Sequence, residues 1–244
     1  MAVGRRAAFT ALLLLAAVAI GMATAPGRDE FAPARRRMLE EIRANGGVTD
    51  PRVLAALEAV PRHRFVPEGE RNAAYEDRPL PIGSGQTISQ PSIVALMTSL
   101  LDIRPGSRIL EVGTGSGYQA AVLSRLAGEV YSIEIVKPLG ERARRTLSEL
   151  GYRNVHLRIG DGYQGWPSAA PFDGIVVTAA PPSIPEPLLR QLKTGGKLVI
   201  PVGDTLQDLW VLTKRRDGGF DRRRVLPVLF VPMTGEAQKR PPSR

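Results

Sequence analysis

The sequence predicts an α/β fold in which a doubly wound, mostly parallel sheet of about seven strands carries helices on both faces. Three observations predict this fold. Apolar, strand-like runs alternate with amphipathic stretches of helical period along most of the 244 residues. One of these runs leads into a glycine-rich turn, and a helical pattern follows that turn directly. The next two runs end in acidic residues at the spacing that a strand-helix-strand unit requires.

The elements follow in a simple order along the chain. Helical patterns near 33–45 and 51–60 precede a polar loop and a further helix that begins near Ile93. The helix after the glycines is expected at 118–127. Strands are expected at 108–112, 130–135, 155–159, 175–177, 197–201, 209–213 and 225–230.

Length and composition fit one catalytic domain. A chain of 244 residues with 43% hydrophobic content can bury a full α/β core. We place this domain at residues 31–234 and find no internal repeat. Residues 235–244 are polar and contain prolines, so we expect a disordered tail there.

An acidic residue and three alternating glycines separate the first strand from its helix: Glu111, Gly113, Gly115 and Gly117. Glycine accepts positive φ and lets a ligand approach the main chain closely. The N-terminus of the following helix would face that ligand. A dinucleotide fingerprint requires its third glycine at the position of Tyr118, which argues against NAD.

Acidic residues also end the next two strands. Glu134 lies about twenty residues beyond the glycines, where a carboxylate can bind both hydroxyls of a ribose. The third strand runs into Asp161 and Gly162, which would place a second carboxylate over the base of a nucleoside. The alternative for both acids is turn or helix capping. Their joint spacing favours a nucleoside site at the carboxyl ends of three strands.

Glu111 and its glycines resemble the first motif of the Rossmann-like S-adenosylmethionine-dependent methyltransferases. Upstream, the segment PIGSGQTISQP at 81–91 closely resembles the substrate loop of the protein-L-isoaspartate O-methyltransferases, which methylate damaged aspartyl residues. The resemblance runs from about residue 31 to about residue 234, with further matching segments at 55–66, 160–166, 172–182 and 195–203.

The resemblance implies S-adenosyl-L-methionine as the cofactor and damaged proteins bearing L-isoaspartyl residues as partners. It implies that Ser89 is the active-site serine, whose hydroxyl binds the substrate carboxylate or its neighbouring backbone. Thr87, Ile88 and Gln90 would lie along the cleft, and Thr234 near it. The methyl ester would then collapse to a succinimide that reopens partly as normal aspartate.

The composition suits that chemistry. A carboxylate is ionised at neutral pH and can attack a methyl sulfonium without a general base. The chain has no cysteine and only two histidines, so we expect no metal site. Ser89 has a competing interpretation as a helix N-cap, because Pro91 suits a first helical turn. Two other function classes remain open: a methyltransferase for a small molecule or nucleic acid, and a non-catalytic anchored binding protein.

The net charge of +9 raises the question of nucleic-acid binding. The basic clusters are 35–37, 214–216 and 222–224, and they are dispersed and lack interleaved aromatic residues. We therefore interpret them as solvated faces and hairpin ends and expect no nucleic-acid partner. We also expect a monomer.

Residues 1–25 form a separate segment that resembles a secretory signal or a membrane anchor. Arg5 and Arg6 precede an apolar stretch at 7–20, and small residues follow it. Membrane association through residues 5–25 is one expectation. The resemblance implies a cytoplasmic enzyme instead, and a misassigned start codon is a third interpretation, so the compartment stays open.

Overall fold

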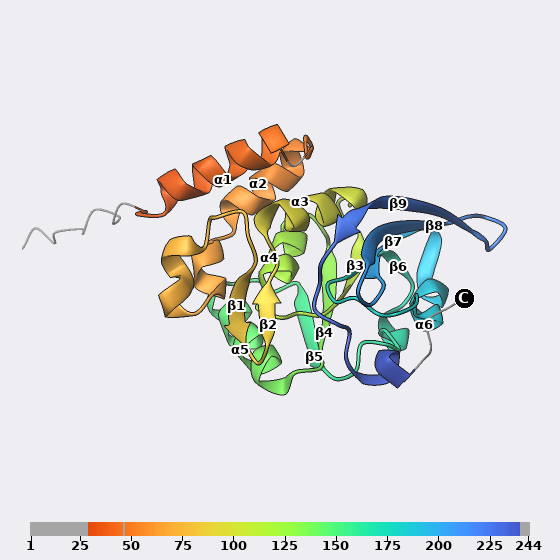
Figure 1. Cartoon of the computed structure of the whole chain (residues 1–244). Coiled ribbons are helices and arrows are strands. Elements are labelled where there is room, and N and C mark those ends of the chain that lie inside the picture. Colours follow the sequence, from red (N-terminus) through yellow and green to blue (C-terminus); the bar gives the residue numbers. More distant parts are fainter. Residues whose placement is uncertain (1–28, 46, 240–244) are drawn as a thin grey trace, which may run out of the picture. The chain divides into compact units, whose positions relative to one another are not determined.

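A seven-stranded sheet organises the computed structural model, which describes residues 29–45 and 47–239 (Figure 1). In spatial order the strands are β5, β4, β3, β6, β7, β8 and β9. The first five run parallel, and β8 and β9 are antiparallel to their neighbours. The bounds are β3 (Arg108–Val112), β4 (Glu129–Glu134), β5 (Val155–Ile159), β6 (Phe172–Val177), β7 (Leu192–Val202), β8 (Gln207–Lys214) and β9 (Phe220–Val228). This architecture confirms the expected doubly wound α/β fold.

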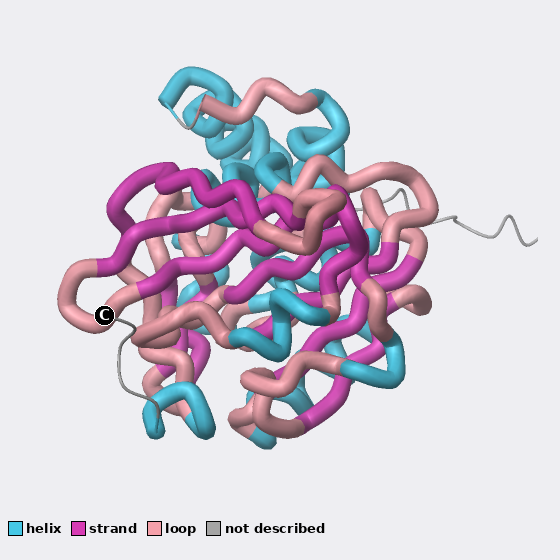
Figure 2. The backbone as a smooth tube through the Cα atoms, turned by 90° about the vertical axis from the view of Figure 1, so that its right-hand side faces the viewer, coloured by secondary structure: helices cyan, strands magenta, loops and turns pink. Residues whose placement is uncertain are grey.

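Helices lie on both sides of the sheet (Figure 2). They are α1 (Ala32–Asn45), α2 (Pro51–Ala59), α3 (Pro91–Leu100), α4 (Tyr118–Ser124), α5 (Lys137–Glu149) and α6 (Glu186–Arg190), with 3-10 turns η1 (Arg62–Phe65), η2 (Glu68–Ala73), η3 (Pro167–Ala169) and η4 (Gly235–Lys239). Alternation along each strand divides the core in two. On β3, for example, Ile109 packs in one apolar cluster, and Leu110 and Val112 pack in the other. Within the described part of the chain, no helix combines the length and apolarity needed to cross a membrane.

Helix α4 ends three residues before the expected 127. Asn154 explains the difference, because its side-chain amide donates to the carbonyls of Ser124, Ala127 and Gly128 at 3.0–3.3 Å. These carbonyls lie at the end of the helix, where intrahelical donors run out. A residue thirty positions away therefore sets the helix end, and the local pattern did not reveal it.

The expected polar loop at 81–91 is largely an antiparallel hairpin of β1 (Leu80–Gly83) and β2 (Gln86–Ile88). Ser84 and Gly85 form its turn with φ of +55° and +69°, as two-residue hairpin turns require. Leu80 and Ile82 are buried while their neighbours are exposed. The alternation was too short to stand out in the sequence.

Strand β9 begins five residues earlier than expected, because Arg222, Arg223 and Arg224 lie on it. It forms one edge of the described sheet, so these side chains stay exposed, which disguised the strand in the sequence. The strand ends at Val228. There the Gln207 side chain accepts from the Phe230 N–H and donates to the Phe230 carbonyl, which takes the place of ladder bonds.

The tail expected at 235–244 is wrong for its first five residues. Residues 235–239 form η4, in which Ala237 is buried. The Glu236 N–H donates to Asp161 Oδ2 at 2.7 Å, which ties this turn to the end of β5. The remaining tail residues and the segment 1–25 lie outside the described residues.

Candidate functional site

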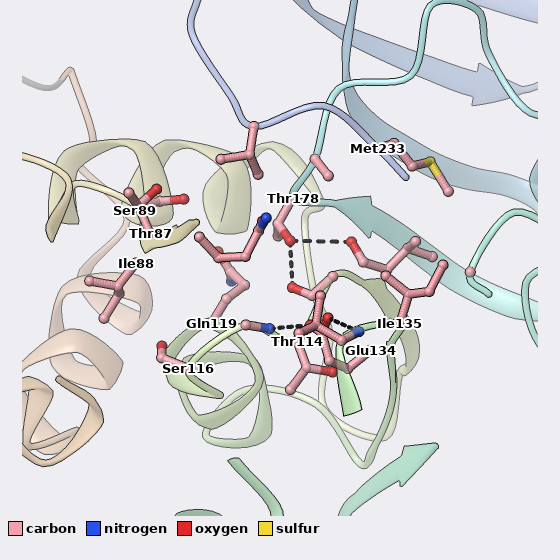
Figure 3. A pocket seen from close by; sticks show the side chains of 18 of the residues that line it. Thr87, Ile88, Ser89, Thr114, Ser116, Gln119, Glu134, Ile135, Thr178 and Met233 are labelled. Carbon is pink, nitrogen blue, oxygen red and sulfur yellow. Dashed lines mark hydrogen bonds between the residues drawn. The ribbon is translucent and has the colours of Figure 1, made fainter. Parts of the chain in front are cut away.

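An open cavity lies at the carboxyl ends of β3, β4 and β6, the edge of a parallel sheet where ligands bind (Figure 3). Its volume is about 800 Å³, counted out to the solvent. The expected site residues that line it are Thr87, Ile88, Ser89, Gly113, Gly115, Glu134, Gly162 and Thr234. Four expected site residues do not line it: Gln90, Glu111, Gly117 and Asp161. The cavity therefore brings residues of the segment 81–91 together with residues of the glycine motif and the acidic strand end.

Gly113 is where the chain leaves β3 and passes close to β6. Its φ is +101°, and an added Cβ would lie 2.3 Å from the Thr178 hydroxyl oxygen. That hydroxyl donates to the Gly113 carbonyl at 2.5 Å. The Thr178 N–H donates to the Val112 carbonyl at 2.9 Å. Gly113 thus leaves room for the Thr178 side chain to lie against the loop in the cavity wall.

Gly115 and Gly117 have different roles, although the motif repeats them evenly. A Cβ on Gly115 would enter the cavity region, with only the Ile82 Cδ1 within 4 Å, at 3.5 Å. A Cβ on Gly117 would instead lie 3.3 Å from Ala143 and Leu147 of α5. Gly117 is also the N-cap of α4, with φ of +91°. Gly117 therefore serves the packing of α4 on α5 and does not line the cavity, and its expected contact with the cofactor stays a prediction.

Glu134 ends β4 and joins the glycine loop to the strand end. Its Oε2 accepts from the Gly115 N–H at 2.7 Å, and its Oε1 accepts from the Val136 N–H at 2.8 Å. The side chain is buried and lines the cavity. Each carboxylate oxygen can accept more than one hydrogen bond, so ribose hydroxyls can still bind to it. The position predicted for a ribose-binding acid is retained.

Asp161 does not line the cavity. Its Oδ1 accepts from the Tyr163 N–H at 2.9 Å and its Oδ2 from the Glu236 N–H at 2.7 Å. The turn-capping alternative is the one the structure supports for this residue. Gly162 does line the cavity, and an added Cβ would lie 2.4 Å from Val112 Cγ1. Close packing against β3 therefore requires glycine there.

Glu111 lies beneath the glycine loop, fully buried. The Ser132 hydroxyl donates to its Oε2, and Ser132 in turn hydrogen-bonds the Thr114 hydroxyl at 2.5 Å. Burial raises the pKa of Glu111 to about 8, and the nearby Glu134 charge adds to the increase. Glu111 therefore supports the loop from below through Thr114, which lines the cavity, and does not itself face the ligand.

The hairpin and the segment after β9 form the opposite wall of the cavity. Thr87, Ile88 and Ser89 line it from β2 and its end. Gln90 does not line the cavity, and its amide donates to the Ser92 hydroxyl at 2.8 Å. Thr234 belongs to the segment 231–234, which a short parallel bridge joins to Ala180.

Ser89 does not cap α3. The N-cap is Gln90, which makes no side-chain cap bond. No hydrogen bond of the Ser89 hydroxyl occurs with any described residue, and the residue lines the cavity half-buried. The hydroxyl is thus free to bind a ligand, which favours the active-site interpretation over the capping one.

Sequence reasoning missed several lining residues. Thr114 and Ser116 lie between the motif glycines, and Thr178 begins the segment after β6. Gln119 lies in the first turn of α4, and its amide donates to the Thr98 hydroxyl of α3 at 2.9 Å. Variable positions inside a glycine motif carry little signal of their own. Gln119 could have been found from the helical period, which turns it toward α3.

Replacing Glu111 by Gln tests the buried acid through the pH dependence of stability. The unfolded chain loses this proton near the ordinary pKa of 4.5, while the folded chain keeps it up to about 8. Rising pH therefore destabilises the wild type across that window. Glu111→Gln cannot ionise, so its stability relative to wild type should increase with pH by on the order of a few kcal/mol. Urea unfolding at several pH values measures this difference. Glu68→Gln, at an exposed position, controls for loss of a charge, and a flat difference would contradict the buried assignment.

Comparisons with known proteins agree with this geometry. The family described as Protein-L-isoaspartate(D-aspartate) O-methyltransferase (PCMT) matches residues 34–238. A Polaromonas sp. relative named Protein-L-isoaspartate O-methyltransferase 2 is 56% identical over 203 residues, covering 82% of this chain and 96% of that one. The Opitutus terrae Protein-L-isoaspartate O-methyltransferase is 54% identical and covers 95% of this chain and 98% of its own.

Two solved structures agree as well. One, titled protein-L-isoaspartate O-methyltransferase, aligns with a TM-score of 0.77 at 32% identity over 83% of this chain and 67% of that one. The other is a Plasmodium falciparum putative protein-L-isoaspartate O-methyltransferase in complex with S-adenosyl-L-homocysteine. It aligns with a TM-score of 0.72 at 28% identity and covers 82% of this chain and 98% of that one. The glycine loop, Glu134 and the substrate loop at 81–91, hereafter the Ser89 loop, surround one cavity. The chain belongs to the protein-L-isoaspartate(D-aspartate) O-methyltransferase family.

Proposed function

We propose that this protein transfers the methyl group of S-adenosyl-L-methionine to the side-chain carboxylate of L-isoaspartyl residues in damaged proteins. The transfer initiates their repair to aspartyl residues. One observation carries the proposal: the nucleoside-type half of the cavity, with Gly115 and Glu134, faces the Ser89 loop across a single space. Membership of the family supports it.

The residues present fit the cofactor. Gly115 leaves open the space that any side chain would fill, which suits a ligand lying against the backbone. Glu134 would hold the ribose through the remaining lone pairs of its carboxylate. Gly162 and Ile135 line the same side of the cavity. The cofactor supplies an activated methyl group, and these residues bind and orient it.

The cavity lacks a general base, which bears on the methyl acceptor. Among its described lining residues only Glu134 and Tyr118 are ionisable. Burial raises the pKa of Tyr118 to about 12, so it stays protonated, and Glu134 is held by two backbone N–H groups. A hydroxyl or an ammonium group must lose a proton to accept a methyl, whereas a carboxylate at neutral pH need not. The lining therefore favours a carboxylate over the hydroxyl or amino groups of a small molecule or nucleic acid.

What the site contributes is alignment. Holding the two reacting groups in line can contribute about 7–11 kcal/mol to lowering the barrier. Ser89 would fix the acceptor side by donating its free hydroxyl to the substrate carboxylate or nearby backbone. The hairpin that carries Ser89 is held against the cofactor half, because the Arg142 guanidinium of α5 donates to the Ile82 carbonyl.

Changing the two glycines separates cofactor binding from packing. Gly115→Val should abolish binding of S-adenosylhomocysteine, because the side chain fills the open space. The φ of +54° strains valine, so some stability is lost as well, but the fold should persist. Gly117→Ala should lower stability by about 1–3 kcal/mol through positive φ and crowding against α5, with affinity retained. Calorimetric titration and denaturant unfolding measure the two effects. Equal affinity of Gly115→Val and wild type would place the cofactor elsewhere.

Replacing Ser89 tests the acceptor side. The wild type should methylate an isoaspartyl peptide and leave its aspartyl twin unmodified. Ser89→Ala should lower kcat/KM for the isoaspartyl peptide by about 10–100-fold, which corresponds to about 1.5–3 kcal/mol for a hydrogen bond to a charged group. Cofactor affinity and stability should change little, because the hydroxyl caps no helix. Unreduced turnover in Ser89→Ala would refute the role of this serine.

The compartment depends on residues 1–25, which lie outside the described residues. Their charged, apolar and small-residue regions support export or membrane anchoring. The cytosolic origin of the cofactor supports a cytoplasmic enzyme. Export or anchoring predicts a membrane-bound protein, or one whose N-terminus lies just after Ala23 or Ala25. Cell fractionation with N-terminal sequencing of the native protein measures this, and a soluble cytoplasmic product beginning at Met1 or Met22 would exclude export.

A further inference from the structure

Arg62 is a buried cation that contacts two residues lining the cavity, Ser89 and Tyr118. It begins η1, and its side chain is 0% exposed. Its Nε donates to the Ala74 carbonyl at 2.7 Å, and its Nη2 donates to the Ser89 carbonyl at 2.8 Å. The guanidinium also lies 4.7 Å from the centre of the Tyr118 ring. One side chain therefore contacts both the substrate loop and the first residue of α4.

Packing alone does not explain a guanidinium at this place. Among the residues that the structure covers, no carboxylate forms an ion pair with it, although the Asp77 charge lies near enough to favour the cation. Its Nη1 is buried without a well-formed hydrogen bond, and so is the neighbouring Tyr118 hydroxyl, which interacts with the guanidinium. Removing an unpaired charge from water is costly, and an apolar side chain of similar length would avoid that cost. Burial lowers the pKa of Arg62 to about 10, so the group still carries its charge at neutral pH.

The Ser89 loop is held at two backbone points. Arg62 binds the Ser89 carbonyl, and Asp77 Oδ1 accepts from the Ser92 N–H at 2.8 Å. The Ser89 hydroxyl has no partner of its own in the described chain, so its direction follows from how the backbone is held. Of the two points, the one on Ser89 itself is made by Arg62.

Tyr118 connects the same guanidinium to the cofactor half. It follows Gly117 directly and lines the cavity as the first residue of α4. A guanidinium stacked on an aromatic face fixes the relative position of both groups. The planar guanidinium of Arg62 therefore contacts both the substrate loop and helix α4, and fixes their positions relative to each other.

We propose that Arg62 is a positioning residue, which holds the Ser89 carbonyl against Tyr118 and so directs the Ser89 hydroxyl toward the cofactor half of the cavity. This role rests on the proposed function. It predicts that a change at Arg62 impairs turnover of the isoaspartyl substrate through Ser89 and leaves cofactor binding intact.

Arg62→Lys is the main variant, because it keeps the charge but loses the planar fork that reaches two carbonyls and stacks on Tyr118. We expect kcat/KM for an isoaspartyl peptide to fall by about 10–100-fold. The dissociation constant of S-adenosylhomocysteine should stay within about threefold of wild type. Arg62→Met extends the series if it folds.

Arg108→Lys is the matched control. Its guanidinium donates to the Ala169 carbonyl at 3.0 Å and lies 5.9 Å from the Tyr131 ring centre, at the opposite end of β3. It should retain full turnover.

A double-mutant cycle with Ser89→Ala separates positioning from a general loss of structure. If Arg62 acts through Ser89, then Arg62→Lys should change kcat/KM by less than about threefold once the hydroxyl is absent. Fully multiplicative effects of the two changes would overturn the proposal.

Hydrogen exchange provides a readout that does not depend on activity. Arg62→Lys should accelerate amide exchange at residues 86–90 while β3 and β4 stay protected, and Arg108→Lys should not. Unchanged exchange at 86–90 in Arg62→Lys would overturn the positioning role of Arg62, even if the variant were active. If the wild type failed to methylate the isoaspartyl peptide but exchange at 86–90 accelerated in Arg62→Lys, the proposed function would fail and the positioning role would stand.

Discussion

The carboxylate of Glu134 is the interaction on which the rest of the site depends. It accepts one N–H from the glycine loop and one from the start of the next segment, so it fixes the loop relative to the end of β4. Thr178, which directly follows β6, also fixes the loop by donating its hydroxyl to the Gly113 carbonyl. From below, Glu111 supports it through Ser132 and Thr114. Hydrogen bonds within the protein therefore hold the glycine loop in place without a ligand, which lowers the entropy cost of ordering the loop on binding.

The two walls of the cavity come from different kinds of structure. The cofactor side consists of strand ends and a helix start, whose positions the parallel sheet sets. The acceptor side consists of a short hairpin and the segment 231–234, which few hydrogen bonds hold. Arg142 and Arg62 supply some of those bonds from outside the sheet. The precision of the acceptor side thus rests on individual side chains, and the precision of the cofactor side rests on the fold.

The sequence was sufficient where function follows from local pattern. The bounds of β3 and β5 were predicted correctly, and Gly113, Gly115, Glu134 and Ser89 line one cavity. It failed where distant partners decide. Asp161 looked like a ligand-binding acid, and only the structure shows that it caps the turn through the N–H groups of Tyr163 and of Glu236, which is 75 positions away. Gly117 was indistinguishable from Gly115 without knowing that α5 lies against it. Arg62 gave no signal, because a buried cation looks like any surface arginine in a sequence.

The arginines of β9 have a consequence for an enzyme that handles damaged chains. An extended segment of any chain readily joins the open edge of a sheet as an additional strand. Here the edge carries three adjacent exposed arginines, and Pro227 removes one backbone donor. A strand added at this edge would be repelled by the arginines if the incoming chain is basic. Its side chains would also displace water from the guanidinium groups, which costs free energy. The charge and the proline therefore make this edge unfavourable for pairing with an extended chain.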